Sequence, residues 1–359
     1  MRRNIRNERR GAIVVLSALL MAALVGMVAY AIDHGYLLKL QTDLQKAADA
    51  SALAGVQDLI RQADGTQDVA AAKQTVINYV RNNLGEEGFQ VALDDIQIGR
   101  YDPDTIYTGL QLLNTGTFDT VRVTLRRDGA LNPQAPLFFA RVFGHDEAAI
   151  YATGTAVLQK AQGMAPGAEI LPFATPKELW DSLSPGDLWT AYGNGKIADE
   201  SGAEVPGNWG TVDVGYTGNS SSDLNDQILN GLRQADLDAL VADGRTSNTE
   251  YLDSAEPAWM QGDTGLSSGL KQSVQLVHGS KKLIPIYDQL ANPNGSHVDF
   301  HVIGWGVVTV IDSVWSGSTN TSVVLEKSHW MNGKLRPKGT LGWGDVVIEG
   351  AYTSPVLVE

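Results

Sequence analysis

The sequence predicts an α+β fold that opens with a single transmembrane helix, continues into an α+β domain and ends in a mostly-β domain. Three observations lead to this prediction. Residues 11–32 carry no formal charge, small and apolar residues keep a helical spacing well beyond them, and all eight tryptophans lie after residue 167. A chain of 359 residues with 43% apolar residues is long enough for two or three domains with their own cores.

Charge and cysteine content exclude several classes of function. The formal net charge is −14, yet the first ten residues carry five arginines against Glu8. The remaining residues carry 22 basic against 40 acidic side chains, whereas nucleic-acid binding needs a basic face, so we expect no nucleic acid as a partner. Without cysteine the chain forms neither a disulfide framework nor a cysteine-based zinc site, and we expect no cofactor.

The uncharged segment 11–32 has the length of a membrane crossing. As an α-helix its 22 residues would span about 33 Å, against a hydrocarbon core about 30 Å thick. No other stretch of this length lacks charge, which predicts a single-pass protein. Because positively charged flanks stay in the cytoplasm, residues 1–10 are expected to form a cytoplasmic basic tail and the bulk of the chain to be extracytoplasmic. The flanking arginines are Arg2, Arg3, Arg6, Arg9 and Arg10.

A cleaved signal peptide is the alternative interpretation of this segment. Ala29-Tyr30-Ala31 fits the small-x-small pattern of a cleavage site after an apolar core. The apolar run is longer than the roughly 7–15 residues of a signal core, however, and the helical pattern continues past it. A retained anchor, with residues 11–32 in membrane lipid, is therefore the favoured prediction.

Small residues predict helix packing both within and beyond the span. Within it they recur every four residues, a stripe that lets another helix approach closely. Beyond it the spacing persists without proline, which predicts one helix from about 12 to 62 whose outer half packs a narrow alanine face on a sheet or on neighbouring helices. The residues predicted for packing and assembly are Ala18, Ala22, Gly26, Leu44, Ala48, Ala52 and Gly55.

These residues also carry a family resemblance. The Arg-Arg-Gly at 9–11, Asp33 and Gly35, Leu44-Gln45 and the Ala-Asp-Ala-Ser-Ala-Leu-Ala-Gly run at 48–55 closely resemble the N-terminal region of TadE/TadG-like proteins of Flp (tight adherence) pilus assembly, nearest the TadG type. The resemblance covers residues 9 to 60 well and continues more loosely to about 160. It implies an inner-membrane-anchored, non-catalytic component whose partners are other pilin-like subunits and the Tad secretion machinery.

The sequence departs from such relatives in two places. Related pseudopilins carry a glutamate five residues into the mature apolar segment, and residues 11–16 read Gly-Ala-Ile-Val-Val-Leu. Many TadG proteins carry an Asp-x-Ser-x-Ser metal motif, and this string is absent. Processing by a prepilin peptidase and a metal-dependent adhesion site are therefore not carried over.

Two domains follow the membrane span. Residues 33–160 are expected to form a pilin-like α+β domain with a helix over 68–84 capped by Gly85. Its other expected elements are strands over 89–93, 96–99, 121–126 and 150–158 and a short helix over 136–143.

Residues 161–167 change in composition and are expected to form a linker to a Trp-rich, β-dominated domain over 168–359. The elements expected there are helices over 224–242 and 267–277 and strands over 298–303, 307–310, 322–325 and 346–348.

Three motifs have both a chemical and a structural interpretation. Residues 265–269 satisfy the Gly-x-Ser-x-Gly string of hydrolases, but the preceding segment is polar and glycine-broken, so Ser267 is expected to cap a helix rather than act as a nucleophile. His297, Asp299 and His301 would project from one face of a strand as zinc ligands or as an ordinary solvent face. Asp236, Asp238 and Asp243 resemble a calcium loop, although a helix surface is the favoured interpretation. No catalytic or metal site is therefore predicted.

Three functions remain open from sequence. The first is a membrane-anchored component of pilus assembly, supported by residues 9 to 60. The second is a membrane-tethered extracytoplasmic binding protein or adhesin whose affinity lies in the Trp-rich domain. The third is a tethered hydrolase, which would depend on Ser267 or on His297 and His301.

Overall fold

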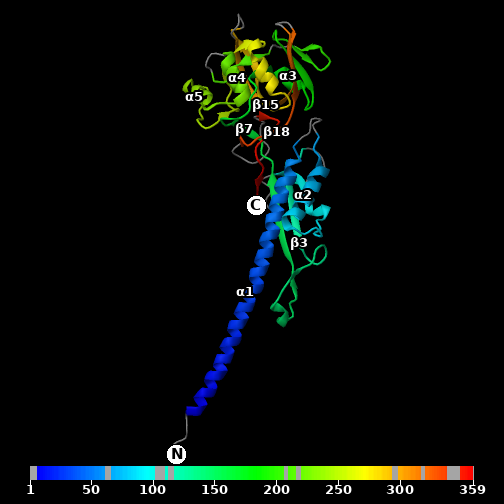
Figure 1. Cartoon of the computed structure of the whole chain (residues 1–359), viewed down its shortest axis with the longest axis vertical. Helices are drawn as coiled ribbons and strands as arrows, with labels where there is room; N and C mark the ends of the chain where they lie inside the picture. The colour runs from blue at the N-terminus through cyan, green and yellow to red at the C-terminus, as the bar shows by residue number, and fades with distance from the viewer. Residues whose placement is uncertain are drawn as a thin grey trace, which may run out of the picture.

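The computed structural model describes residues 6–60, 66–101, 110–111, 117–205, 209–215, 220–292, 298–316, 320–337 and 348–358. The N-terminal helix α1 (Arg6–Gln57) projects as a long rod from a small α+β unit, and a larger, mostly-β unit lies at the far end of the molecule (Figure 1). We call these the proximal unit and the distal unit. The predicted fold class is confirmed.

The proximal unit combines two helices with an antiparallel sheet. In this sheet the strand order is β2-β1-β3-β6-β22, and every neighbouring pair is antiparallel. The elements of the proximal unit after α1 are α2 (Val69–Leu84), η1 (Leu93–Asp95), β1 (Ile96–Tyr101), β2 (Leu110–Gln111), β3 (Thr120–Arg127), β4 (Ala135–Pro136), η2 (Ala140–Phe143), β5 (Glu147–Ala148), β6 (Ile150–Val157) and β22 (Val356–Leu357).

Helices α1 and α2 share one core with the sheet. Val76 and Val80 of α2 are fully buried in this core, as is Val123 of β3. Gly85 ends α2 with φ +65°, as the sequence predicts, and the Asp68 carboxylate caps its start by accepting a hydrogen bond from the Ala71 N–H at 2.7 Å.

Two local predictions for the proximal unit are wrong. Residues 89–93 do not form a strand, because the Asn132 side chain takes both hydrogen bonds of the Gln90 backbone, at 2.8 and 2.9 Å, where a strand would need a neighbouring strand. The helix expected over 136–143 is reduced to the 3₁₀ turn η2, since Pro136 instead pairs with Glu147 in the β4–β5 hairpin.

The distal unit is built on a ten-stranded sheet that closes on itself. Strands β16, β14, β12, β8 and β15 form a ring, because β15 pairs with β16 as well as with β8, and the sheet is barrel-like. Its strands are β8 (Phe173–Pro176), β9 (Leu188–Tyr192), β10 (Ile197–Asp199), β11 (Glu204–Val205), β12 (Gly210–Val212), β14 (Ala258–Thr264), β15 (Lys281–Ala291), β16 (Val298–Ser316), β17 (Asn320–Lys327) and β20 (Ile348–Glu349).

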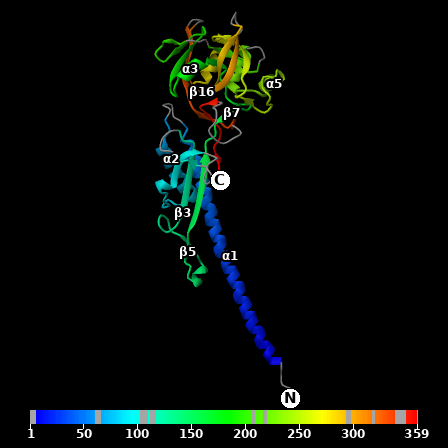
Figure 2. The same ribbon diagram turned by 180° about the vertical axis from the view of Figure 1, so that it is seen from behind.

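Shorter elements surround this sheet. They are β7 (Ala161–Met164), β13 (Leu252–Asp253), β18 (Trp330–Met331), β19 (Leu335–Pro337), β21 (Ala351–Tyr352), α3 (Lys177–Ser182), α4 (Ser221–Asn230), α5 (Gln234–Ala242), η3 (Ser268–Leu270) and α6 (Lys271–Leu276). Figure 2 shows them from behind, at the end of the molecule away from the N-terminus.

Several distal predictions need correction. The helix expected over 224–242 is two helices, α4 and α5, because Gly231 turns the chain with φ +78° and a Cβ there would collide with the Ala168 carbonyl oxygen. The strands expected over 298–303 and 307–310 are one strand, β16, and the helix over 267–277 is split into η3 and α6. Of the strand expected over 346–348, only Ile348 lies within the described residues.

The connection between the units is more ordered than the sequence suggests. Residues 161–167, expected as a linker, contribute β7, which pairs with β13 and β19 and buries Met164 completely. The chain later returns to the proximal unit, where Val356 of β22 pairs with Val157 of β6. The distal unit is thus inserted between two neighbouring strands of the proximal sheet, and the domain boundaries stay a prediction.

Candidate functional site

The N-terminal helix divides into a bare half and a packed half. Helix α1 has 52 residues, a length of about 78 Å, and from Ile13 to Val28 every side chain is exposed. Among the described residues it is the one helix that is long and apolar enough to cross a membrane. The described part of the chain leaves the side chains of this half exposed, which favours an apolar surrounding from outside the chain.

The small residues of the bare half are accessible. Ala18, Ala22 and Gly26 are all exposed, and a Cβ on Gly26 would meet no atom within 4 Å. A second helix therefore has room to approach this stripe. Packing of another subunit there stays a prediction.

The predicted residues of the packed half are used inside the chain. Leu44, Ala48 and Ala52 are buried in the core shared with α2 and the sheet. A Cβ on Gly55 would lie 2.5 Å from Cγ2 of Val76, so α1 and α2 approach closely at this glycine. This face is consequently covered by the protein's own α2 and sheet.

Asp33 lies where the bare half meets the packed half, and it is 6% exposed. Its carboxylate accepts hydrogen bonds from the N–H groups of Phe138 at 2.8 Å, Phe139 at 3.0 Å and Ala140 at 2.7 Å. Burial raises the pKa of Asp33, but the three backbone donors outweigh it, so the pKa lies below its ordinary value. The carboxylate therefore stays charged and holds the start of η2 against α1.

Sequence reasoning missed this contact. Asp33 and Gly35 served there only as marks of a resemblance, and Gly35 itself is exposed, with no atom within 4 Å of where a Cβ would lie. The available signal was a lone carboxylate at the end of an uncharged run, which needs a partner when it is buried. The partner amides lie more than a hundred residues away in the chain, and no local pattern points to them.

Ser267 lies at a helix start, as predicted. Its hydroxyl accepts from the Gly269 N–H at 3.3 Å and lies 3.2 Å from the Ser221 hydroxyl. Strand β14 runs up to Gly265, but its side chains alternate between buried and more exposed positions, so it is not the fully buried strand of a nucleophile elbow. The serine is thus a cap whose contacts are backbone and another serine.

Of the pattern His297, Asp299 and His301, the two residues that the structure describes have separate partners. His301 Nδ1 lies 2.6 Å from the Asp288 carboxylate, and its ring packs on Trp259 with centroids 4.9 Å apart. Asp299 accepts from the Asn292 amide at 2.9 Å, and His297 lies outside the described residues. No group of three metal-ligating side chains occurs within the described residues.

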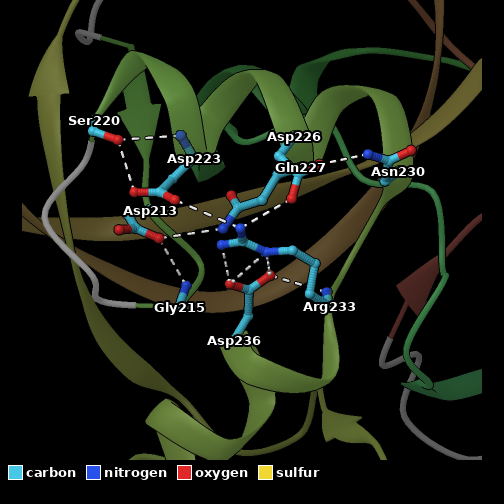
Figure 3. Close-up of polar contacts among 9 residues, drawn as sticks. All are labelled: Asp213, Gly215, Ser220, Asp223, Asp226, Gln227, Asn230, Arg233 and Asp236. Carbon is cyan, nitrogen blue, oxygen red and sulfur yellow. Dashed lines mark hydrogen bonds and ion pairs between the residues drawn. The ribbon is translucent and has the colours of Figure 1, made fainter.

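The acidic residues near α5 surround an arginine (Figure 3). Arg233 binds Asp236 at 2.5 Å and Asp226 at 3.0 Å, and Asp236 has no exposed surface. The expected helix-surface role is therefore wrong for Asp236, whereas Asp238 and Asp243 are exposed. Hydrogen bonding to Asp236 raises the pKa of Arg233, so this cluster is a charge-neutralising brace between α4 and α5.

The tryptophans are mostly core residues. Of the seven within the described chain, four are buried, two are partly buried and Trp259 is 38% exposed. The buried ones are Trp180, Trp189, Trp209 and Trp305. A surface for stacking on ligands therefore has few aromatic residues in the described part of the distal unit.

Family comparisons match the proximal unit. Residues 11–58 match the family described as putative Flp pilus-assembly TadE/G-like, and residues 54–156 match the family described as putative Tad-like Flp pilus-assembly. No curated protein and no solved structure matched the chain. The two family matches run from the start of the uncharged segment into β6, and they confirm the resemblance found in the sequence. Over residues 11–156, the chain is similar to these Tad-like Flp pilus-assembly families.

Proposed function

We propose that this protein is a TadG-type, non-catalytic component of Flp pilus assembly, anchored in the inner membrane by α1 with the bulk of the chain extracytoplasmic. The single observation that carries the proposal is that the family matches fall on α1 and on the unit it packs into. The family matches support a role in pilus assembly, and the TadG type is our finer assignment.

The division of α1 supports the anchoring part of the proposal. The bare half is uncharged and apolar, and arginines precede it, as expected for a crossing with a cytoplasmic N-terminus. The packed half then carries the proximal unit directly, without a loop between them. One rigid rod would therefore join the membrane to the exposed units.

The absence of cysteine in the whole chain makes topology easy to test. We would introduce Asn4→Cys or Leu276→Cys, the latter at a side chain that is 67% exposed, and label intact spheroplasts with a membrane-impermeant maleimide. The proposal expects labelling at position 276 and, only after permeabilisation, at position 4. Labelling of position 4 in intact spheroplasts contradicts the orientation.

The assembly role is tested by counting pili. Deletion of the gene should abolish or strongly reduce piliation, and the intact gene should restore it. A Gly26→Leu variant fills the accessible stripe and should restore fewer pili at an equal membrane level, whereas Ala31→Leu, on the opposite face of the same helix, should restore them fully. Normal piliation after deletion argues against pilus assembly as the function.

The alternative function, a membrane-tethered binding protein, can be distinguished from pilus assembly by the partners that the protein binds. The detergent-extracted full chain should recover pilin-like subunits or Tad machinery in a pull-down. Recovery of a glycan without any pilus protein supports the alternative instead.

A further inference from the structure

An apolar hairpin leaves the proximal unit beside α1. It consists of β4, η2 and β5, residues 135–148, and it carries large apolar side chains in the open: Phe138 is 55% exposed, Val142 82% and Phe143 79%. Soluble surfaces seldom gather such side chains on one short loop. Among the residues that the structure describes, none buries these three side chains.

The hairpin lies at the level of the bare half of α1. Asp33 holds its backbone, and its Phe139 and Phe143 line an apolar cavity of about 220 Å³ together with Gly26 and Tyr30 of α1. Gly26 precedes Asp33 by seven residues, about 10 Å along the helix towards the N-terminus. Both views show the β4–β5 hairpin running alongside α1 in the direction of the N-terminus (Figures 1 and 2).

This level is the outer end of the uncharged segment. Residues 26–32 form the last turns of that segment, and the hairpin reaches them from outside. If lipid surrounds α1 at these turns, the same lipid layer meets the hairpin tip. The continuity of one apolar surface from the helix to the loop therefore favours lipid over a separate protein partner.

Several backbone N–H groups of the hairpin already have hydrogen-bond acceptors, as a poorly hydrated environment requires. The Asp33 carboxylate satisfies three consecutive N–H groups at the start of η2, and the N–H groups of Val142 and His145 donate to carbonyls of Phe139 and Ala140 within the loop. Unsatisfied amides would oppose entry into a membrane interface. The charged side chain of Arg141 is 57% exposed, on a long stem that can reach phosphate groups.

We propose that the apolar hairpin inserts Val142 and Phe143 into the outer leaflet of the membrane that α1 crosses, with Asp33 fixing its depth. The inference rests on the proposed membrane anchoring of α1. A second contact beside the helix would set the height and tilt of the proximal unit on the bilayer, which a single crossing helix leaves free to rotate.

Site-specific fluorescence tests this proposal. Single-cysteine variants Val142→Cys, Met21→Cys and Tyr79→Cys of the full chain would carry an environment-sensitive NBD label in vesicles of phosphatidylethanolamine and phosphatidylglycerol. Met21 reports on the helix, and Tyr79, 47% exposed on α2, is the matched aqueous control. We expect nitroxide-labelled lipid to quench position 142 at least about two-fold more than position 79, because position 142 would lie at the boundary of headgroups and acyl chains and position 79 in water.

The outcomes separate the two proposals. Quenching at 21 without quenching at 142 overturns the hairpin insertion and leaves the anchor standing. No quenching at 21 overturns both. Protection of position 142 from aqueous iodide without quenching by nitroxide lipid shows a protein cover and also overturns the insertion. All three side chains are exposed, so labelling should not disturb the core.

Discussion

Gly154 of β6 lies against the backbone of Ala48 in α1, so closely that a Cβ on Gly154 would be 2.7 Å from the Ala48 carbonyl carbon. The sheet and the helix thus meet through main chain on both sides. A side chain at position 154 would collide with the helix backbone, so this approach of β6 to α1 requires glycine on the strand.

Enlarging this contact should destabilise the proximal unit. Gly154→Val would force β6 away from α1, and overpacking of this kind costs about 1–3 kcal/mol. Thermal unfolding of the detergent-extracted full chain, followed by hydrogen exchange in α1 and β6, measures the loss. Gly88→Ala is the control, because a Cβ there would meet no atom within 4 Å, and it should leave unfolding unchanged.

Removing the charge of Asp33 should release the hairpin. In Asp33→Asn the amide accepts less strongly than a carboxylate, so hydrogen exchange at Phe138, Phe139 and Ala140 should accelerate. Asp43→Asn, on the exposed side of the same helix, should leave these amides protected. Equal exchange in both variants would mean that the hairpin is held by other contacts.

The contact between the Asp33 carboxylate and the three backbone N–H groups should be sensitive to acid. The pKa of Asp33 is lower in the folded protein than its ordinary value of 3.8, so its stabilising effect is complete above that value and is lost as the pH falls through the folded pKa. Exchange of the three η2 amides should therefore be unaffected from pH 7 to about 5 and faster, after correction for intrinsic rates, below about 4. In Asp33→Asn this added acid effect should vanish.

Arg233→Met should destabilise the distal unit. The substitution leaves Asp236 buried without its cationic partner, and breaking a buried pair costs about 3–5 kcal/mol, reduced to about 2 kcal/mol here because Arg233 is partly exposed. Denaturant unfolding measures the difference. Lys196→Met removes a surface pair with Glu204 and should change stability by less than about 1 kcal/mol.

Lys327→Met should destabilise the distal unit around Trp180. The buried ammonium donates to the carbonyls of Trp180 at 2.9 Å and Leu183 at 3.0 Å and pairs with Glu349 at 3.0 Å. Both carbonyls would lose this charged donor, and because the Trp180 carbonyl keeps the Leu183 N–H at 3.4 Å, the expected cost is that of one unsatisfied group, roughly 1–3 kcal/mol. Tryptophan fluorescence and thermal unfolding report the change, and Lys177→Met, at an exposed pair with Asp181, should show neither.

Sequence reasoning succeeded where the determinants are local. The helical spacing from Leu44 to Gly55 and the cap Gly85 lie within or beside the helices they define, and the structure has those helices there. The strand expected over 89–93 failed because its hydrogen-bonding partner is the side chain of Asn132, about forty residues away. The periodicity of a segment does not indicate which distant residue its backbone will bind.

The distant contacts were likewise hidden. The break at Gly231 is needed because Ala168 approaches it from another part of the chain, and the closure of the barrel depends on β15 meeting both β8 and β16. Asp33 shows the same limit for the site, since nothing near it in sequence indicates the amides it binds. Local sequence patterns thus predicted α1 and the fold class. The helix break, the barrel closure and the contacts of Asp33 depend on tertiary contacts.

The return of the chain from the distal unit to β6 has a mechanical consequence. Val356 and Leu357 pair with β6, the strand after which the chain enters the distal unit. Two segments of the chain, one leaving and one returning, therefore connect the distal unit to the proximal unit. A force on the distal unit is therefore shared between these two connections. The pairing of β22 with β6 must break before the distal unit can move away from α1.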